Sequence, residues 1–167
     1  NDKVGDEKPM HKVSLDVFYM DKYETTTARY AKFLDAVGQR PPMFWNQGNQ
    51  VGYTDRPVVG VNWHDADAYC RWAGKRVPTE AQWEKAGRGA DGRLCPWGNE
   101  ERTPKHANFG RGEWKGYSTL TSIGSFEKGK SPYGVHDMAG NVSEWVADWY
   151  EPQYYSASPP LNPQGPA

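Results

Sequence analysis

The chain has 167 residues and a formal net charge of -1, which is enough length for one domain with a core and too little charge to predict nucleic acid as a partner. Aromatic residues make up 14% of it, whereas hydrophobic residues reach only 37%, and 18 Gly and 13 Pro interrupt the sequence. This composition excludes a disordered chain, which would leave many tryptophans in water, and it favours an irregular, loop-rich α+β domain. No apolar run is long enough to span a membrane.

The N-terminal part combines one predicted strand with one predicted helix. Residues 1–12 are polar and are expected to be a flexible or connecting segment. Residues 13–20 alternate apolar and polar side chains before becoming continuously apolar, which predicts a strand that is first half-buried and then buried. Residues 26–37 follow with apolar side chains at helical spacing, threonines that can cap the first turn and Gly38 at the C-terminal end, which together predict a helix.

Two further helices are predicted in the middle of the chain. Asn62 caps the first, which places Tyr69 and Cys70 on its buried face and ends at Gly74. The second covers about residues 79–87 and begins with the capping box Thr79-Glu80-Ala81-Gln82. We therefore expect about three helices in all.

The remaining segments are turn-rich. Residues 39–57 read as a loop whose rings attach it to the body. Residues 56–61 read as a short buried strand or an extended segment, and residues 121–126 read as a short strand. Residues 151–167 form a tail rich in Pro, Tyr and Ser that is expected to be a flexible or connecting segment. The predicted domain is thus residues 13–150, incomplete at its C-terminus.

The usual catalytic motifs do not occur. The four histidines lack zinc-site spacing, and the sequence contains neither a nucleophile elbow nor a phosphate-binding or dinucleotide-binding loop. Cys70 and Cys95 form no metal motif, and the sequence leaves both a disulfide between them and two free thiols open.

Residues 133–150 concentrate glycines, oxygen donors and large aromatic side chains in a run with neither helical nor strand periodicity. Gly134 and Gly140 permit backbone angles that other residues avoid. Asp137, Asn141 and Glu144 supply the oxygens that a hard cation such as calcium prefers. Two interpretations follow from the residues alone: a cation site, or a loop whose carboxylates cap neighbouring backbone amides.

Several segments together resemble the formylglycine-generating enzyme, or sulfatase-modifying factor, family. They occur in the order seen in that family: Asp21-Lys22-Tyr23-Glu24-Thr25-Thr26, Pro57-Val58-Val59-Gly60-Val61-Asn62-Trp63, residues 68–84, Pro96-Trp97-Gly98-Asn99 and Gly140-Asn141-Val142-Ser143-Glu144-Trp145. The resemblance implies the irregular, calcium-containing variant of the C-type lectin fold.

The resemblance also implies a chemistry for the complete domain. In that family a pair of cysteines binds copper, activates dioxygen and oxidises a cysteine in a sulfatase Cys-x-Pro-x-Arg segment to formylglycine. The pair belongs to a C-terminal part of the domain that would follow Ala167. Neither Cys70 nor Cys95 matches a catalytic position, so no catalytic residue is carried over. Copper is expected only if such a C-terminal segment exists.

Calcium sites carry over by residue. Asp137 and Glu144 match the side-chain ligands of one site, with the carbonyls of Gly140 and Val142 completing it. Asn108 and the carbonyl of Phe109 match a second site, with the carbonyl of Tyr117 as a third donor. Lys115, however, occupies the position at which the family has a carboxylate ligand.

Two functions follow from the resemblance. The first is a non-catalytic, calcium-stabilised module that recognises or assembles with a protein or peptide, and the replacement of a groove tryptophan by Ser143 favours it. The alternative is part of a copper- and oxygen-dependent oxidoreductase. An extracytoplasmic location is expected, periplasmic or secreted, because relatives are often exported and calcium is abundant there.

Overall fold

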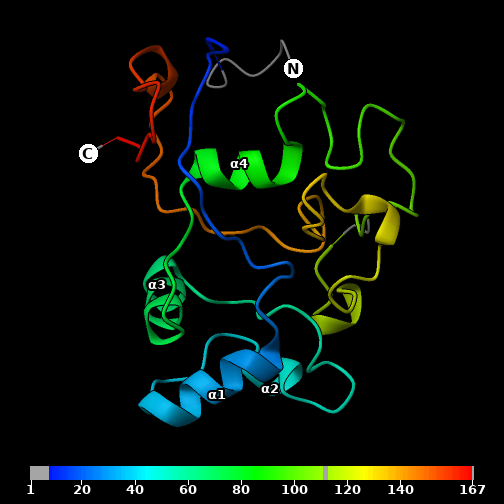
Figure 1. Cartoon of the computed structure of the whole chain (residues 1–167). Coiled ribbons are helices and arrows are strands. Elements are labelled where there is room, and N and C mark those ends of the chain that lie inside the picture. The colour runs from blue at the N-terminus through cyan, green and yellow to red at the C-terminus, as the bar shows by residue number, and fades with distance from the viewer. Residues whose placement is uncertain (1–7, 111–112, 167) are drawn as a thin grey trace.

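The computed structural model describes residues 8–110 and 113–166, and most of this chain is loop (Figure 1). The α-helices are α1 (Thr27–Val37), α2 (Trp45–Gly48), α3 (Trp63–Trp72) and α4 (Glu80–Arg88). Three 3-10 turns follow: η2 (Tyr117–Thr119), η3 (Glu127–Gly129) and η4 (Tyr154–Ser156). No helix in the described part of the chain is long and apolar enough to cross a membrane. The three predicted helices are confirmed, and the four-residue α2 is additional.

The helix ends follow the local chemistry of the sequence. The Thr26 hydroxyl accepts from the Arg29 amide at 3.2 Å, and α1 ends at Gly38 in the left-handed conformation with φ of 66°. A reciprocal capping box begins α4, in which Thr79 and Gln82 each bond the other's backbone amide. These caps satisfy amides that no helical carbonyl can reach.

The predicted strands at residues 13–20 and 121–126 are wrong, and residues 56–61 form no strand beyond one isolated bridge at Pro57. Pairing among the described residues is limited to three isolated bridges, Ser14 with Leu161, Thr26 with Pro57 and Cys95 with Gly98. In the predicted strand at residues 13–20, Val17 is 96% exposed and Tyr19 is 99% exposed, so the expected burial is also wrong. The segment stays extended without becoming a strand because, among the described residues, its ladder pairing is limited to the single bridge at Ser14.

Two separate hydrophobic clusters form among the described residues. The first joins α1 and α3 through the buried side chains of Tyr30, Phe33, Leu34 and Tyr69. Its rings meet edge-to-face or stacked, with 5.2 Å between the centroids of Tyr30 and Phe33. The second cluster joins α4 to the 133–150 stretch through Ala86, Val135 and Met138, with Phe18, Met20 and Trp83 packed against them.

Both ends of the described chain lie against the body at one end of the molecule (Figure 1). The Ser14 amide donates to the Pro160 carbonyl at 2.7 Å, and the Asn162 amide donates to the Ser14 carbonyl at 2.9 Å. The Tyr155 hydroxyl donates to Glu80 on α4 at 2.9 Å. Residues 1–7 of the predicted N-terminal segment lie outside the described residues.

Candidate functional site

The Asp137–Glu144 corner folds against the loop that carries Asn108. Asp137 and Asn141 both have φ of 60°, which bends the chain sharply at each position. The Asn141 amide donates to the Asn108 carbonyl at 2.9 Å. Gly140 lies so close to the same carbonyl that an added Cβ would stand 2.5 Å from its oxygen, which explains the glycine. The structure thus brings the two predicted calcium segments together.

Asn141 connects three segments through its side chain. Its Oδ1 accepts from the Asn108 side chain at 3.1 Å and from the Thr121 amide at 3.0 Å. Its Nδ2 donates to Glu24 Oε2 at 2.7 Å. Because these bonds occupy both ends of the amide, Asn141 positions its neighbours and is not free to hold a cation.

Glu24 belongs to this corner, although sequence reasoning did not select it. Its side chain is 8% exposed and comes from the segment just before α1. Burial, followed by the nearby Asp137 carboxylate, raises the pKa of Glu24 to about 9, while the hydrogen bond from Asn141 opposes the shift. Its Oε1 has no hydrogen-bond partner among the described residues. The sequence feature that could have identified Glu24 is its place in the motif Asp21-Lys22-Tyr23-Glu24-Thr25-Thr26.

The two predicted carboxylate ligands each keep one oxygen free. Asp137 Oδ2 accepts from the Gly124 amide at 2.7 Å, and Glu144 Oε2 accepts from the Trp83 indole. Their second oxygens accept no hydrogen bond among the described residues. Burial raises the pKa of both carboxyls, and in Glu144 the bond from Trp83 opposes this while Asp137 adds to it. A divalent cation would offset this crowding of like charges.

The second predicted calcium set is only partly assembled. Asn108 Oδ1 is buried and has no hydrogen-bond partner among the described residues, so its lone pairs are available to a cation. The Tyr117 carbonyl, however, accepts from the Arg56 guanidinium, so it is not free to bind a cation. The Arg102 guanidinium lies 5.7 Å from the centre of the Phe109 ring. Within the described ranges, no three acidic, histidine or cysteine side chains converge as a metal cage, so carbonyls and water would complete either site.

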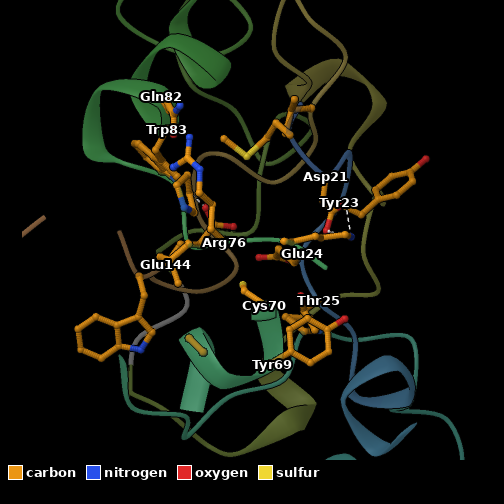
Figure 2. Close-up of a pocket in the computed structure, with 18 of the residues that line it drawn as sticks. Asp21, Tyr23, Glu24, Thr25, Tyr69, Cys70, Arg76, Gln82, Trp83 and Glu144 are labelled. Atoms are coloured by element: carbon orange, nitrogen blue, oxygen red, sulfur yellow. Dashed lines mark hydrogen bonds and ion pairs between the residues drawn. The ribbon is translucent and has the colours of Figure 1, made fainter. Parts of the chain in front are cut away.

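A cavity of about 570 Å³ separates the two core clusters. In Figure 2, Trp83 and Glu144 lie on one side of it, Tyr69 and Cys70 project from α3 on another, and Glu24 lies between them. The volume is that of a small-molecule or side-chain pocket. Glu144 lines this cavity. Its carboxylate is therefore surrounded by protein atoms on most sides and still open to water on the cavity side.

The two cysteines are free and occupy different surroundings. Cys70 packs against the first core cluster on α3, as the sequence predicts. Burial raises the pKa of its thiol, and Asp21 and Asp67 add to this. Cys95 closes a turn with Gly98, with 3.0 Å between the Cys95 amide nitrogen and the Gly98 carbonyl oxygen.

The fold and the corner define a loop-rich domain held together by buried carboxyl and amide side chains and by aromatic clusters. The family described as the sulfatase-modifying factor enzyme 1-like domain matches residues 1–165, and the chain belongs to this family.

Three proteins that are similar in sequence to this chain carry different functional names. It is 38% identical over 180 residues to the serine/threonine-protein kinase pkn1 of Chlamydia pneumoniae, which covers 97% of this chain and 28% of that protein. It is 32% identical over 216 residues to the formylglycine-generating enzyme of Bos taurus, covering 98% and 57%. It is 39% identical over 125 residues to the inactive C-alpha-formylglycine-generating enzyme 2 of Mus musculus, covering 67% and 40%. The chain therefore spans between about a quarter and three fifths of these relatives.

Proposed function

We propose that this domain is a non-catalytic recognition or assembly module, built on a C-type lectin-like fold and stabilised by calcium. The observation that carries the proposal is the state of the two cysteines. Both are free thiols in different surroundings, Cys70 packed against the first core cluster on α3, which does not suit a shared copper site. Cys95 lies in a separate turn. The similarity to a protein named as an inactive enzyme supports the same proposal.

Calcium is proposed at Asp137 and Glu144, with the carbonyls of Gly140 and Val142. The support is the free oxygen that each carboxylate keeps beside a rigid corner of the backbone. Asn108 and the carbonyl of Phe109 are proposed as donors of a second site, on the weaker support of one unpartnered oxygen. When bound, calcium would supply charge compensation and cross-link neighbouring segments of the loop-rich chain.

The alternative function is part of a copper- and oxygen-dependent oxidoreductase that converts a sulfatase cysteine to formylglycine. Its support is the similarity to proteins named formylglycine-generating enzyme across nearly the whole chain. It requires a cysteine pair in a C-terminal segment beyond Ala167.

An aldehyde assay separates the two functions. The native protein, including any segment that follows Ala167, is incubated with a Cys-x-Pro-x-Arg peptide, copper and oxygen, and mass spectrometry follows the peptide, with the Bos taurus formylglycine-generating enzyme as positive control. The proposal predicts no aldehyde from the native protein. Aldehyde product would establish the oxidase and end the non-catalytic proposal.

The proposed partner is a protein or peptide, and the proposed location is extracytoplasmic, where calcium is abundant. A protease-protection assay on intact cells tests the location, since an extracytoplasmic domain is digested without lysis. Digestion only after lysis would contradict it.

A further inference from the structure

The turn that follows α4 contains the dipeptide Asp91-Gly92. Helix α4 ends at Arg88, both residues of the dipeptide are exposed, and the Asp91 side chain is 59% exposed. Gly92 has φ of 77°, and a Cβ added to it would meet nothing within 4 Å. Its amide makes no hydrogen bond within the described ranges. The Gly92 nitrogen is therefore unshielded next to the Asp91 carboxyl group.

These two neighbours permit a rearrangement of the main chain. The Gly92 nitrogen attacks Cγ of Asp91 and forms a C–N bond. The amide proton and the hydroxyl of the carboxyl group leave together as one water, and a five-membered succinimide remains. Water then opens the ring. Opening at Cγ restores aspartate, whereas opening at the backbone carbonyl carbon leaves an isoaspartate, whose main chain runs through Cβ and Cγ. Glycine at the second position hinders the attack least because it has no Cβ.

Arg93 binds the same carboxylate by both of its oxygens. Its Nε donates to Asp91 Oδ1 at 2.9 Å, and its Nη2 donates to Oδ2 at 2.7 Å. The arginine is itself fixed in place, because its Nη1 donates to the Pro96 carbonyl at 3.1 Å and its own carbonyl accepts from Arg88 Nε at 2.8 Å. Such a two-pronged geometry is better defined than that of most surface ion pairs.

We propose that Asp91-Gly92 is a site of isoaspartate formation, and that Arg93 holds the reaction in check by binding both carboxylate oxygens. The fork fixes the plane of the carboxylate, so Cγ does not turn towards the Gly92 nitrogen. This proposal concerns the covalent stability of the turn, and it is independent of the recognition role and of calcium.

The charge of Arg93 acts in the same direction as its geometry. The hydroxyl leaves only from a protonated carboxyl group, and the hydrogen bonds from Arg93 lower the pKa of Asp91 to about 2. Each unit by which the pKa falls makes the protonated form about tenfold rarer near neutral pH. Solvent screens an exposed pair, so we expect the fork to slow the reaction at least about tenfold and less than the whole shift implies.

Isoaspartate is measured in the purified protein during incubation near neutral pH, at a temperature well below its melting point. An isoaspartyl methyltransferase counts the isoaspartyl groups, and electron-transfer fragmentation assigns them to position 91. Arg93→Gln should form isoaspartate at least about tenfold faster than the unaltered protein. Arg93→Lys should lie between the two, because an ammonium carries the charge without the fork. The matched control is Arg71→Gln, which removes the 2.9 Å pair with Asp67 on α3 and should leave the rate at Asp91 unchanged.

Unfolding gives a second measurement that needs no substitution. In urea the fork is absent, so the unaltered protein and Arg93→Gln should form isoaspartate at the same rate, and faster than the folded unaltered protein. Melts of each variant establish that it is folded during the incubation, and Arg93→Lys decides if Arg93→Gln does not fold. Equal rates in the folded unaltered protein and in a folded Arg93 variant would overturn the proposal, as would an equal rise in Arg71→Gln. A folded unaltered protein that reacts as fast as in urea would also overturn it.

Discussion

Replacing Gly140 by alanine tests the contact that fixes the corner, and Gly134→Ala is its matched control. Both glycines have positive φ, 85° and 78°. An alanine at either position therefore lowers the free energy of unfolding by about 1–2 kcal/mol, because its backbone is left-handed. It also raises the free energy of unfolding by roughly 0.4–1 kcal/mol, because the unfolded chain has fewer conformations. The two substitutions share this net cost of about 1 kcal/mol.

Only the Gly140 substitution adds a clash. Its Cβ would stand 2.5 Å from the Asn108 carbonyl oxygen, which also accepts from the Asn141 amide, whereas a Cβ at Gly134 meets nothing within 4 Å. Forcing an extra methyl group into a packed site costs about 1–3 kcal/mol. Gly140→Ala should therefore unfold more easily than Gly134→Ala by that amount, which corresponds to roughly 2–12 °C in Tm for a chain of this size.

Urea and thermal melts followed by tryptophan fluorescence measure the difference, with both variants in the same buffer. Equal destabilisation by the two substitutions would refute the close approach of Gly140 to Asn108. The result does not depend on knowing whether calcium is bound, provided that both variants are measured with and without a chelator.

Three further predictions concern other parts of the chain. Thr79→Ala should cost about 1 kcal/mol in urea melts because α4 loses its capping box, and an unchanged midpoint would exclude that role. Asn141→Ala should cost roughly 2–4 kcal/mol, because it leaves Glu24 and the Thr121 amide without buried partners; a loss under about 1 kcal/mol would contradict its connecting role. Cys70 should react with iodoacetamide at least about tenfold more slowly in the folded chain than in urea, because burial raises the pKa of its thiol; equal rates, or a disulfide detected by mass spectrometry, would contradict its placement.

The helices were predictable because their signals are local. The residues that cap α4, Thr79 and Gln82, are three positions apart, and Gly38 directly follows α1. Side chains this close in sequence meet in any chain that forms the helix. The four-residue α2 escaped prediction because one turn is too short to show a helical period.

The wrong prediction of a strand at residues 13–20 and the omission of Glu24 have one physical reason, which is that both depend on distant segments. A strand needs a partner, and alternation in sequence does not provide one, so Val17 and Tyr19 remain exposed. Glu24 bonds Asn141 across 117 positions of sequence, a contact that only the folded chain reveals. The corner's glycines and oxygen donors were visible in the sequence because they lie within one short run.

Calcium binding at the corner is the central claim about how this domain is held together. Elemental analysis and paired melts of the chain, in calcium and in chelator, test it most directly, with Asp137→Asn as the variant. We expect bound calcium and a Tm that falls on chelation, by the equivalent of about 2.7 kcal/mol when calcium is a hundredfold above its Kd, and a variant whose Tm responds much less. No calcium in the purified chain, together with identical melts in calcium and chelator, would contradict it.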